Sequence, residues 1–322
     1  MRQFAKPTIV VSKCLEFDAC RYNGEMIPDV TIRNLQPFVT FIPVCPEVEI
    51  GLGTPRETIR IVEENGENRL VQTSTREDVT EKMEQFSNDF LQTIPDVDGF
   101  ILKNRSPSCG TRDVKIYSGF EKAPAKGKGA GLFGGAVVKK FSHLPIEEEG
   151  RLSNFIIREH FFTRLFTIAY YKMIKHNKNM KELVSFQSDN KYLFMAYNQV
   201  KQKELGRIIA NHKNEKIEVV FENYEKTLYE LFMRAPRYTS NVNVCEHIFG
   251  YFKTKLKKQE KDHFIELLQK YAEKKIPLSS LLTILKSWAI RFDEKYLLRQ
   301  TYFEPYPEAL VEISDSGKGR DY

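Results

Sequence analysis

Over the first 120 residues, short uninterrupted runs of hydrophobic residues alternate with segments in which hydrophobic residues recur at helical spacing. The runs lie at 8–12 (TIVVS), 39–44 (VTFIPV) and 99–104 (GFILKN), and they are rich in β-branched and aromatic residues. Such runs are typical of strands that are buried on both faces of a parallel sheet. Between the second and third runs, apolar residues recur at helical spacing over 75–91. This alternation predicts βαβ units and an α/β domain with a parallel sheet.

Two further stretches of this first part have local signals. Thr54-Pro55-Arg56-Glu57 has the form of a capping box with proline at the first helical position, and it predicts a helix start. Residues 126–135 (KGKGAGLFGG) are dense in glycine and are interpreted as a linker or an active-site loop that closes the first domain. Glycines beside lysines can cradle a phosphate, but no Walker-type motif is present. A flexible connection around a helix end is therefore the favoured interpretation.

From Arg151 onward the pattern is helical, with three apolar stripes. They predict an all-α domain behind the α/β domain. We therefore expect domains at 1–142 and 143–313, followed by a disordered polar tail at 314–322. The stripes are Ile157, Phe161, Leu165 and Ile168; Phe264, Leu267, Leu268 and Tyr271; and Leu281, Leu282, Leu285 and Ala289.

Composition fits two soluble domains. Of the 322 residues, 41% are apolar and 29% are charged, unlike disordered or membrane proteins. No run reaches the roughly 18 apolar residues of a membrane-spanning helix, and the N-terminus becomes charged too early for a signal peptide. We therefore expect a cytoplasmic protein.

The chain has five cysteines, an odd number, and a reducing compartment disfavours disulfides. The cysteines are therefore expected to be metal ligands, nucleophiles or core thiols.

Charge is divided unevenly along the chain. Residues 1–150 contain 19 Lys and Arg against 22 Asp and Glu, a balance of −3, and the rest contains 30 against 21, a balance of +9. A basic second half is consistent with a polyanionic partner. A lysine-rich solvated surface explains the same balance, so charge alone leaves both interpretations open.

Three cysteines each follow one of the predicted strands. Cys14 comes after the first, Cys45 after the second and Cys109 after the third. The carboxyl ends of parallel strands meet at one edge of a sheet, where open α/β sheets build their sites. The three thiols are therefore expected to share one centre. A structural zinc site usually takes four ligands and CxxC pairs, which are absent here. A 4Fe–4S cluster with one open iron and three unconnected buried thiols remain as alternatives.

Three separated stretches carry a family resemblance: SKCLxxxxCRYNG, FIPVCPEVEIGLGTPRExIRI and LKxxSPSCG. They resemble the thiouracil desulfidase (TudS-like) family over about residues 6–140. The resemblance implies a 4Fe–4S cluster held by Cys14, Cys45 and Cys109, with the open iron taking sulfur from a thiolated base. Cys20 stands where the family often has valine and is treated as spare.

The rest of the chain resembles the helical domain that is often fused behind such desulfidases. The matching stretches are LPIEEEGRLSNFIIREHFFTRLF, LVSFQSDNKYLFMAYNQ, NVNVCEHIFGYFK and YLLRQTYFEPYPEAL. The two-domain combination resembles bacterial tRNA thiouridine desulfidases, which turn 4-thiouridine back into uridine, and it implies tRNA as partner. Where this domain commonly has histidines, the chain has Gln187, Asn190 and Tyr197, which argues against catalysis there. Cys245 is expected to be a buried thiol.

The reaction suggests roles for residues near the cysteines. Replacing C=S by C=O needs water to add at the ring carbon, a proton shuttle, and an acceptor for sulfide, which the resemblance assigns to the open iron. Glu47, two residues after Cys45, is the candidate general base and later acid; a salt-bridge partner or helix-start carboxylate is its alternative. Ser106 is favoured as the second catalytic residue. Weaker substrate-binding candidates, which turn chemistry or salt bridges also explain, are Ser108, Lys103, Arg56 and Tyr22.

Two lysine runs of the second domain are candidate phosphate contacts, with a solvated face as the alternative for each. Aromatic residues beside the second run are able to stack on flipped-out bases. Two other functions stay open: desulfidation of free thiouracil or thionucleosides, and a non-catalytic cluster- or zinc-bearing RNA-binding or sensor module. The runs are Lys172, Lys175, Lys178 and Lys181, which share a face if one helix spans them, and Lys253, Lys255, Lys257 and Lys258, next to Tyr251 and Phe252.

Overall fold

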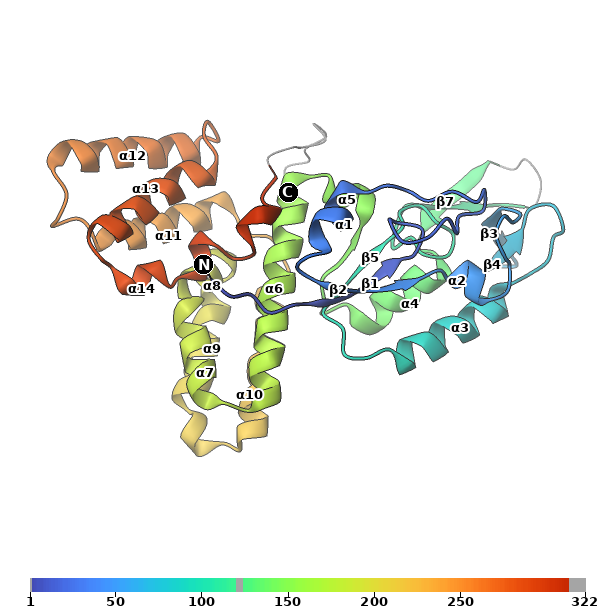
Figure 1. Cartoon of the computed structure of the whole chain (residues 1–322), viewed down its shortest axis with the longest axis horizontal. Coiled ribbons are helices and arrows are strands. Elements are labelled where there is room, and N and C mark those ends of the chain that lie inside the picture. Colours follow the sequence, from blue (N-terminus) through green and yellow to red (C-terminus); the bar gives the residue numbers. More distant parts are fainter. Residues whose placement is uncertain (1, 120–123, 313–322) are drawn as a thin grey trace. The chain divides into compact units, whose positions relative to one another are not determined.

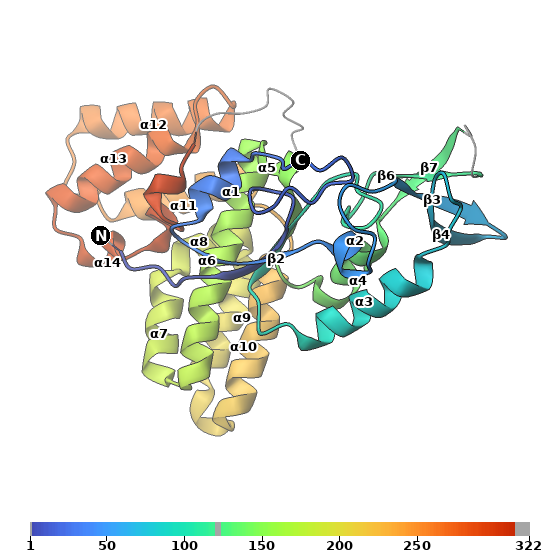
Figure 2. The ribbon, with the colours of Figure 1, turned by 45° about the vertical axis from the view of Figure 1, so that its right-hand side comes forward.

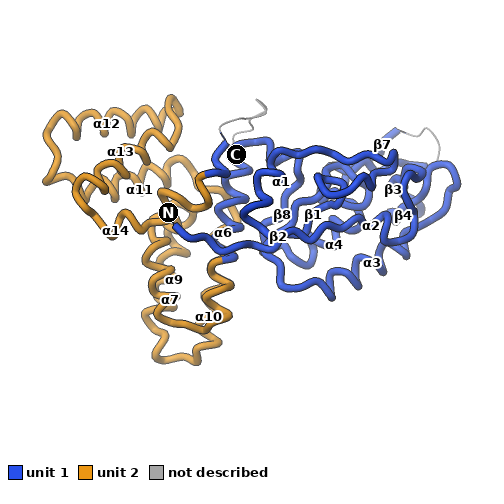
Figure 3. Tube along the Cα trace, viewed as in Figure 1, with its two compact units in different colours: residues 1–169, 309–322 blue, residues 170–308 orange. Residues whose placement is uncertain are grey.

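The computed structural model describes residues 2–119 and 124–312. The chain forms two compact units (Figure 3), Met1–Ala169 with Ala309–Tyr322, and Tyr170–Glu308. The division falls inside a long helix, whereas the sequence analysis places a domain boundary between residues 142 and 143. The predicted tail at 314–322 lies outside the described residues.

A four-stranded parallel sheet forms the centre of the first unit (Figure 1). Its strands are β1 (Thr8–Ser12), β2 (Thr40–Val44), β5 (Gly99–Leu102) and β8 (Ile146–Glu148), in the order β2-β1-β5-β8. The three predicted strands are confirmed, and all pairings in this sheet are parallel. β1 and β5 lie in the middle and are almost fully buried, which explains their uninterrupted apolar sequences.

Helices cover both faces of this sheet. Figures 1 and 2 show α3 (Thr80–Thr93) and α4 (Leu132–Phe141) on one face, with α1 (Val30–Leu35) on the other. The ring of Phe133 in α4 packs edge-on against that of Phe90 in α3, with their centroids 5.8 Å apart. The helix that was predicted over 75–91 is present, and it starts later because residues 73–75 form a turn and Asp78 pairs with Val71 in a β-bridge.

A second, mixed sheet lies beside the first, and the sequence analysis did not predict it. It consists of β3 (Ile59–Glu64), β4 (Glu67–Gln72), β6 (Val114–Tyr117) and β7 (Ala125–Gly129), in the order β4-β3-β6-β7. β3 and β4 form a hairpin whose Asn-Gly turn has positive φ at both residues. β7 occupies half of the glycine-dense stretch, and α4 begins in the other half. The interpretation of that stretch as a flexible connection is therefore wrong.

The predicted helix start at Thr54-Pro55-Arg56-Glu57 is also wrong. These residues form a bend that leads into β3. The Thr54 hydroxyl accepts a hydrogen bond from the Arg56 guanidinium at 3.4 Å, so it does not cap a helix. No helix forms here because the hairpin that follows pairs residues 59–72 in a sheet. Helix propensity is a weak preference that such tertiary pairing overrides.

The second unit is helical, as predicted, and its interior is rich in aromatic rings. The rings of Tyr171 and Tyr224 stack 5.4 Å apart, and Cys245 is fully buried, which confirms its prediction as a core thiol. None of the helices in the described part of the chain combines the length and the apolar character needed to cross a membrane. The helices from α5 onward are α5 (Glu149–Leu152), α6 (Phe155–Asn177), α7 (Met180–Asp189), α8 (Lys191–Tyr197), α9 (Gln199–Ala210), α10 (Ile217–Leu231), α11 (Tyr238–Gly250), α12 (Lys258–Ala272), α13 (Leu278–Arg291) and α14 (Lys295–Leu298).

The first lysine run does not form one helical face. α6 ends at Asn177, and Lys178 has a φ of 48°, so the chain turns before α7 begins. Lys175 pairs with Glu225 at 2.7 Å and Lys178 pairs with Glu218 at 2.8 Å. Two of the four lysines are therefore already neutralised by neighbouring carboxylates.

Candidate active site

Three loops at the carboxyl edge of the parallel sheet bring three cysteine thiols together. Burial, and after it the charge of Cys45, raises the pKa of Cys14 to about 12. Burial likewise raises the pKa of Cys109; the Ser12 hydroxyl lowers it in part, and the charges of Cys14 and Cys45 raise it again. The charge effects among these causes act only between groups within electrostatic range of one another. The expected shared centre is therefore consistent with where the strands place these loops.

A fourth cysteine lies against this centre. The Cys45 thiol donates to the backbone carbonyl of Cys20 over 3.8 Å. Burial, followed by the charge and the hydrogen bond of Cys45, raises the pKa of the Cys20 thiol to about 12. The sequence analysis set Cys20 aside as spare, although its position on the loop of Cys14 was a signal that both thiols end at one edge.

Glu47 lies at the centre of a buried hydrogen-bond network beside the thiols. It belongs to α2 (Pro46–Glu49), which begins directly after Cys45 with proline at its first position. Its Oε2 accepts from the Arg56 Nε at 2.8 Å and from the Arg56 Nη2 at 2.6 Å, while its Oε1 accepts from the Ser108 hydroxyl at 2.6 Å. The carboxylate is thus held at both oxygens and points one of them toward the loop of Cys109.

Arg56 ties the cysteine loops to this carboxylate. Its Nη1 donates to the carbonyl oxygens of Cys20 and Gly53, both at 2.9 Å, and its Nη2 lies 4.0 Å from the Cys45 sulfur. The Arg56 side chain is only 4% exposed and that of Glu47 only 13% exposed. In so buried an ion pair, losing one partner leaves an uncompensated charge, so Arg56 acts as a positioning residue for Glu47 and both loops.

Ser106 and Ser108 extend the network to the third thiol. Their hydroxyls lie 2.9 Å apart. The Ser108 hydroxyl is also 3.7 Å from the Cys109 sulfur, whereas the Ser106 hydroxyl accepts from the Cys109 backbone N–H at 3.2 Å. Ser108 therefore contacts Glu47 directly, and Ser106 reaches it through Ser108. This geometry favours Ser108 for the role for which the sequence analysis preferred Ser106.

The residues of this site lie within the part of the chain that is similar to known proteins. Residues 9–149, which contain all of the groups above, match the family model of 2-thiouracil desulfurase. The uncharacterized protein YbbK of Bacillus subtilis (strain 168) is 36% identical over 118 residues, which cover 34% of this chain and 77% of that protein.

The chain belongs to the 2-thiouracil desulfurase family.

Other comparisons extend beyond this desulfurase domain. Residues 191–307 match a family of unknown function, DUF1722. The uncharacterized protein YbgA of Escherichia coli (strain K12) is 23% identical over 156 residues, or 48% of this chain and 92% of that protein. Among solved structures, the [4Fe-4S]-dependent thiouracil desulfidase TudS is 26% identical, with 46% of this chain and 93% of that chain covered and a TM-score of 0.33.

The two remaining candidates of the desulfurase domain have different surroundings. The Lys103 ammonium pairs with Glu149, and its charge lowers the pKa of Cys14, so it lies within electrostatic reach of the thiols. The backbone carbonyl of Tyr22 accepts from the Arg56 N–H at 2.8 Å. The Tyr22 ring is 43% exposed and lies under the Arg21 guanidinium. Lys103 therefore acts on the thiols through its charge, whereas Tyr22 contacts Arg56 through its backbone.

Ser12, the last residue of β1, also belongs to the site and was not predicted from the sequence. Its hydroxyl accepts from the Lys103 N–H at 2.9 Å and lowers the pKa of Cys109 through a hydrogen bond. The side chain is 1% exposed, so a polar group at the end of a buried strand needs such partners. A lone serine between three apolar residues and Lys13-Cys14 was the available signal.

Glycines of the glycine-dense stretch at 126–135 pack against the loop that contains Cys109. The Gly131 N–H donates to the Gly110 carbonyl at 2.7 Å, and the Gly134 N–H donates to the Ser108 carbonyl at 2.9 Å. A Cβ at Gly134 would lie 2.3 Å from the Gly110 oxygen and 2.4 Å from the Cys109 oxygen. Only glycine lets α4 approach the loop this closely.

We expect Gly134→Ala to lower the free energy of unfolding by about 1–3 kcal/mol, because the added methyl group must displace the backbone of the cysteine loop. Thermal unfolding of the purified variant measures this change. Gly135→Ala is the matched control, since its Cβ meets nothing closer than the Ala130 side chain at 3.4 Å. Equal unfolding temperatures for the two variants would contradict the close packing of α4 on this loop.

Proposed function

We propose that this protein removes sulfur from a thiolated uridine in tRNA, converting 4-thiouridine to uridine with the help of a 4Fe–4S cluster. The observation that carries the proposal is the hydrogen bond, at the edge of the sheet, between Glu47, two residues after Cys45, and the Ser108 hydroxyl, 3.7 Å from the Cys109 sulfur. Membership of the 2-thiouracil desulfurase family supports the class of reaction.

The thiols fit a cluster by their chemistry and their neighbours. Cys14, Cys45 and Cys109 would hold it through three sulfur ligands, the donor type that iron–sulfur clusters take. Within the described residues, no three Cys, His, Asp or Glu side chains lie close enough together to hold a single metal ion, so the support for a cluster is the donor type and the shared edge of the sheet. When bound, a cluster with one iron lacking a protein ligand supplies a Lewis acid for the substrate's sulfur.

The chain's own residues move protons and position the water. Desulfidation breaks the C–S bond and forms a C–O bond with oxygen from water, so no electrons are exchanged. The Glu47 Oε1, which accepts from Ser108 at 2.6 Å, takes a proton from the attacking water and later returns it to the leaving sulfur. Arg56 holds the other oxygen, so the carboxylate keeps its orientation. Ser106 keeps the Ser108 hydroxyl in line with Glu47.

The second half of the chain, which contains the helical unit, supplies the argument for tRNA. Residues 151–322 hold 30 basic against 21 acidic residues, an excess of +9. Tyr251 is 37% exposed, and its ring stacks on that of Tyr296 with the centroids 6.3 Å apart. The ammonium group of the nearby Lys253 lies over the Phe249 ring. Lysines bind phosphates without regard to sequence, and exposed aromatic rings stack on unpaired bases. Such a surface suits RNA, although Lys255 of the second run is paired with Glu294.

Free thiouracil is the second candidate substrate, because the matching family model is described by that base. In that case the helical unit serves another purpose, such as dimerisation. The two substrates predict different salt dependence, since only RNA binding releases counterions from phosphates.

The deciding experiment is anaerobic. The protein is reconstituted with iron and sulfide and incubated with 4-thiouridine-containing tRNA or with free 2-thiouracil, and loss of the thiobase absorbance in the near ultraviolet is followed. We expect the tRNA reaction to be faster and to slow at least about tenfold between 50 and 200 mM salt. If only free thiouracil is converted, the proposal that tRNA is the substrate is wrong. If neither compound is converted, the proposal that the protein is a desulfidase is wrong.

A further inference from the structure

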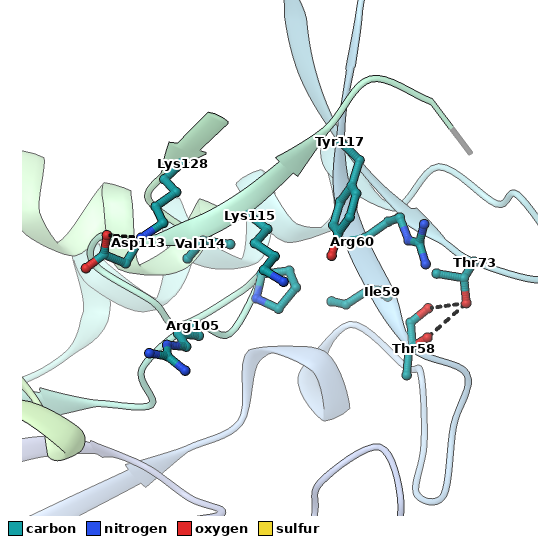
Figure 4. A pocket seen from close by; sticks show the side chains of 11 residues that line it. Thr58, Ile59, Arg60, Thr73, Arg105, Asp113, Val114, Lys115, Tyr117 and Lys128 are labelled. Carbon is teal, nitrogen blue, oxygen red and sulfur yellow. Dashed lines mark hydrogen bonds and ion pairs between the residues drawn. The ribbon is translucent and has the colours of Figure 1, made fainter. Parts of the chain in front are cut away.

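A basic pocket lies in the first unit next to the mixed sheet (Figure 4). Its volume is about 470 Å³, and its walls come from β3, β6, β7 and the loop before Cys109. Four cationic side chains and one acidic side chain line it, which leaves an excess of three positive charges. The charged residues are Arg60, Arg105, Lys115, Lys128 and Asp113.

Two of these four cations have no carboxylate partner in the described part of the chain. Lys128 pairs with Asp113 at 3.1 Å, and the Arg60 guanidinium lies over the Tyr117 ring, 4.7 Å from its centroid. In the described part of the chain, neither Arg105 nor Lys115 forms an ion pair. Gathering unpaired cations in one hollow is unfavourable unless an anion binds there.

The pocket and the active site share one wall. Arg105 and Pro107 line the pocket, whereas the residues between and after them, Ser106, Ser108 and Cys109, belong to the network around Glu47. Because consecutive Cα atoms are 3.8 Å apart, five residues in sequence span at most about 15 Å. The Ser106 carbonyl accepts from the Gly110 N–H at 2.9 Å, so the loop is a turn and the real span is shorter.

A pyrimidine bound beside Glu47 and Cys109 therefore has its ribose and phosphate within reach of this pocket. Arginine binds phosphate oxygens in a fork, and lysine adds a point charge. The Thr58 and Thr73 hydroxyls, 2.9 Å apart at the pocket's far side, add neutral hydrogen-bonding groups. A free base carries no group that would use these side chains.

We propose that the basic pocket binds the phosphate next to the thiolated base, so that the enzyme selects a nucleotide or an RNA strand over the free base. This inference rests on the proposed desulfidation. It assigns the recognition of the reacting nucleotide to the first unit, and it is independent of the lysines of the helical unit.

The test uses the cluster-loaded full chain with Arg105→Gln and Lys115→Gln combined. Both side chains are exposed, so the protein is expected to fold normally. The matched control is Lys139→Gln, which removes a positive charge from an exposed position of α4 outside the pocket. The kcat/KM values of 4-thiouridine 3′,5′-bisphosphate and of the nucleoside 4-thiouridine are compared. Separately, calorimetry measures the Kd of uridine 3′,5′-bisphosphate, which cannot react.

We expect the wild type to prefer the bisphosphate over the nucleoside. The double variant should lose about tenfold or more of that preference, the effect of one charge-assisted hydrogen bond, with the nucleoside rate unchanged. The Kd of the uridine bisphosphate should rise by a similar factor, and Lys139→Gln should change neither value. A thiolated trinucleotide identifies the source of the phosphate: a higher kcat/KM than the bisphosphate indicates RNA, and an equal value indicates a mononucleotide.

Unchanged preference and unchanged Kd in the double variant would overturn the pocket's role while leaving desulfidation intact. If the wild type desulfurises no thiolated pyrimidine, the proposed reaction fails, and the Kd measurement still decides on the pocket. The two failures are therefore distinguishable.

Discussion

Cys109→Ser is expected to lose the cluster and to reduce desulfidation to background. The side chain is 5% exposed and in electrostatic contact with Cys14 and Cys45, so no solvent ligand can take its place easily. Serine keeps the size and polarity of the residue and removes only the soft sulfur donor that iron–sulfur clusters require. Iron and sulfide content after anaerobic reconstitution, together with the visible absorbance of the cluster, measures the loss directly and without substrate.

Cys245→Ser is the matched control for this change. Cys245 is also fully buried, but it lies in the helical unit near the Tyr302 hydroxyl at 3.8 Å. We expect this variant to keep both cluster and activity. Cys20→Ser tests whether a cysteine near the site is needed for the cluster without being a ligand. Cys20 contacts Cys45 but is not one of the three proposed ligands. Full iron content in Cys109→Ser, or its complete loss in Cys20→Ser, would contradict the three-ligand assignment.

Glu47→Gln is expected to lower kcat by about 10²–10⁴, the usual contribution of a positioned general acid–base. Glutamine retains the length and one acceptor oxygen for the Ser108 hydroxyl, but it cannot take up a proton. The neutral amide also leaves the Arg56 guanidinium without its counter-ion, so some loss of stability accompanies the loss of rate. Single-turnover kinetics at saturating substrate, with the cluster content measured in the same sample, isolates the chemical step.

Glu49→Gln serves as the control, since Glu49 lies two residues further along α2 and is exposed. It tests whether any loss of negative charge near the cysteines slows the reaction. Retention of wild-type kcat in Glu47→Gln would remove Glu47 from the proton shuttle. In that case Ser108, which bridges Glu47 and Cys109, becomes the next residue to replace, by alanine.

Much of the central fold could be predicted because its strands have simple sequences. β1 and β5 are buried on both faces, so nearly every residue in them is apolar and the runs end where the burial ends. The mixed sheet escaped prediction for the opposite reason. Its strands are half-exposed and rich in charges, as in Glu67–Gln72, and only the Asn65-Gly66 turn marks them.

The site divides in a similar way. The convergence of Cys14, Cys45 and Cys109 follows from local sequence, because each comes just after a parallel strand and such strand ends share an edge. The partners of Glu47 do not follow, since Arg56 reaches it across a bend that looked like a helix start, and Ser108 approaches from 61 residues away. Nor does the basic pocket, which gathers cations from three strands and a loop.

The sequence by itself determined the parallel sheet, the helical second part and the edge where three thiols meet. These features depend on periodicity and burial, which neighbouring residues encode together. Only the tertiary structure decided that Cys20 joins the thiols, that Ser108 rather than Ser106 touches Glu47, and that Lys175 is neutralised by Glu225. Those outcomes depend on pairs that are distant in sequence, whose distances are set by how the elements pack and by no local pattern.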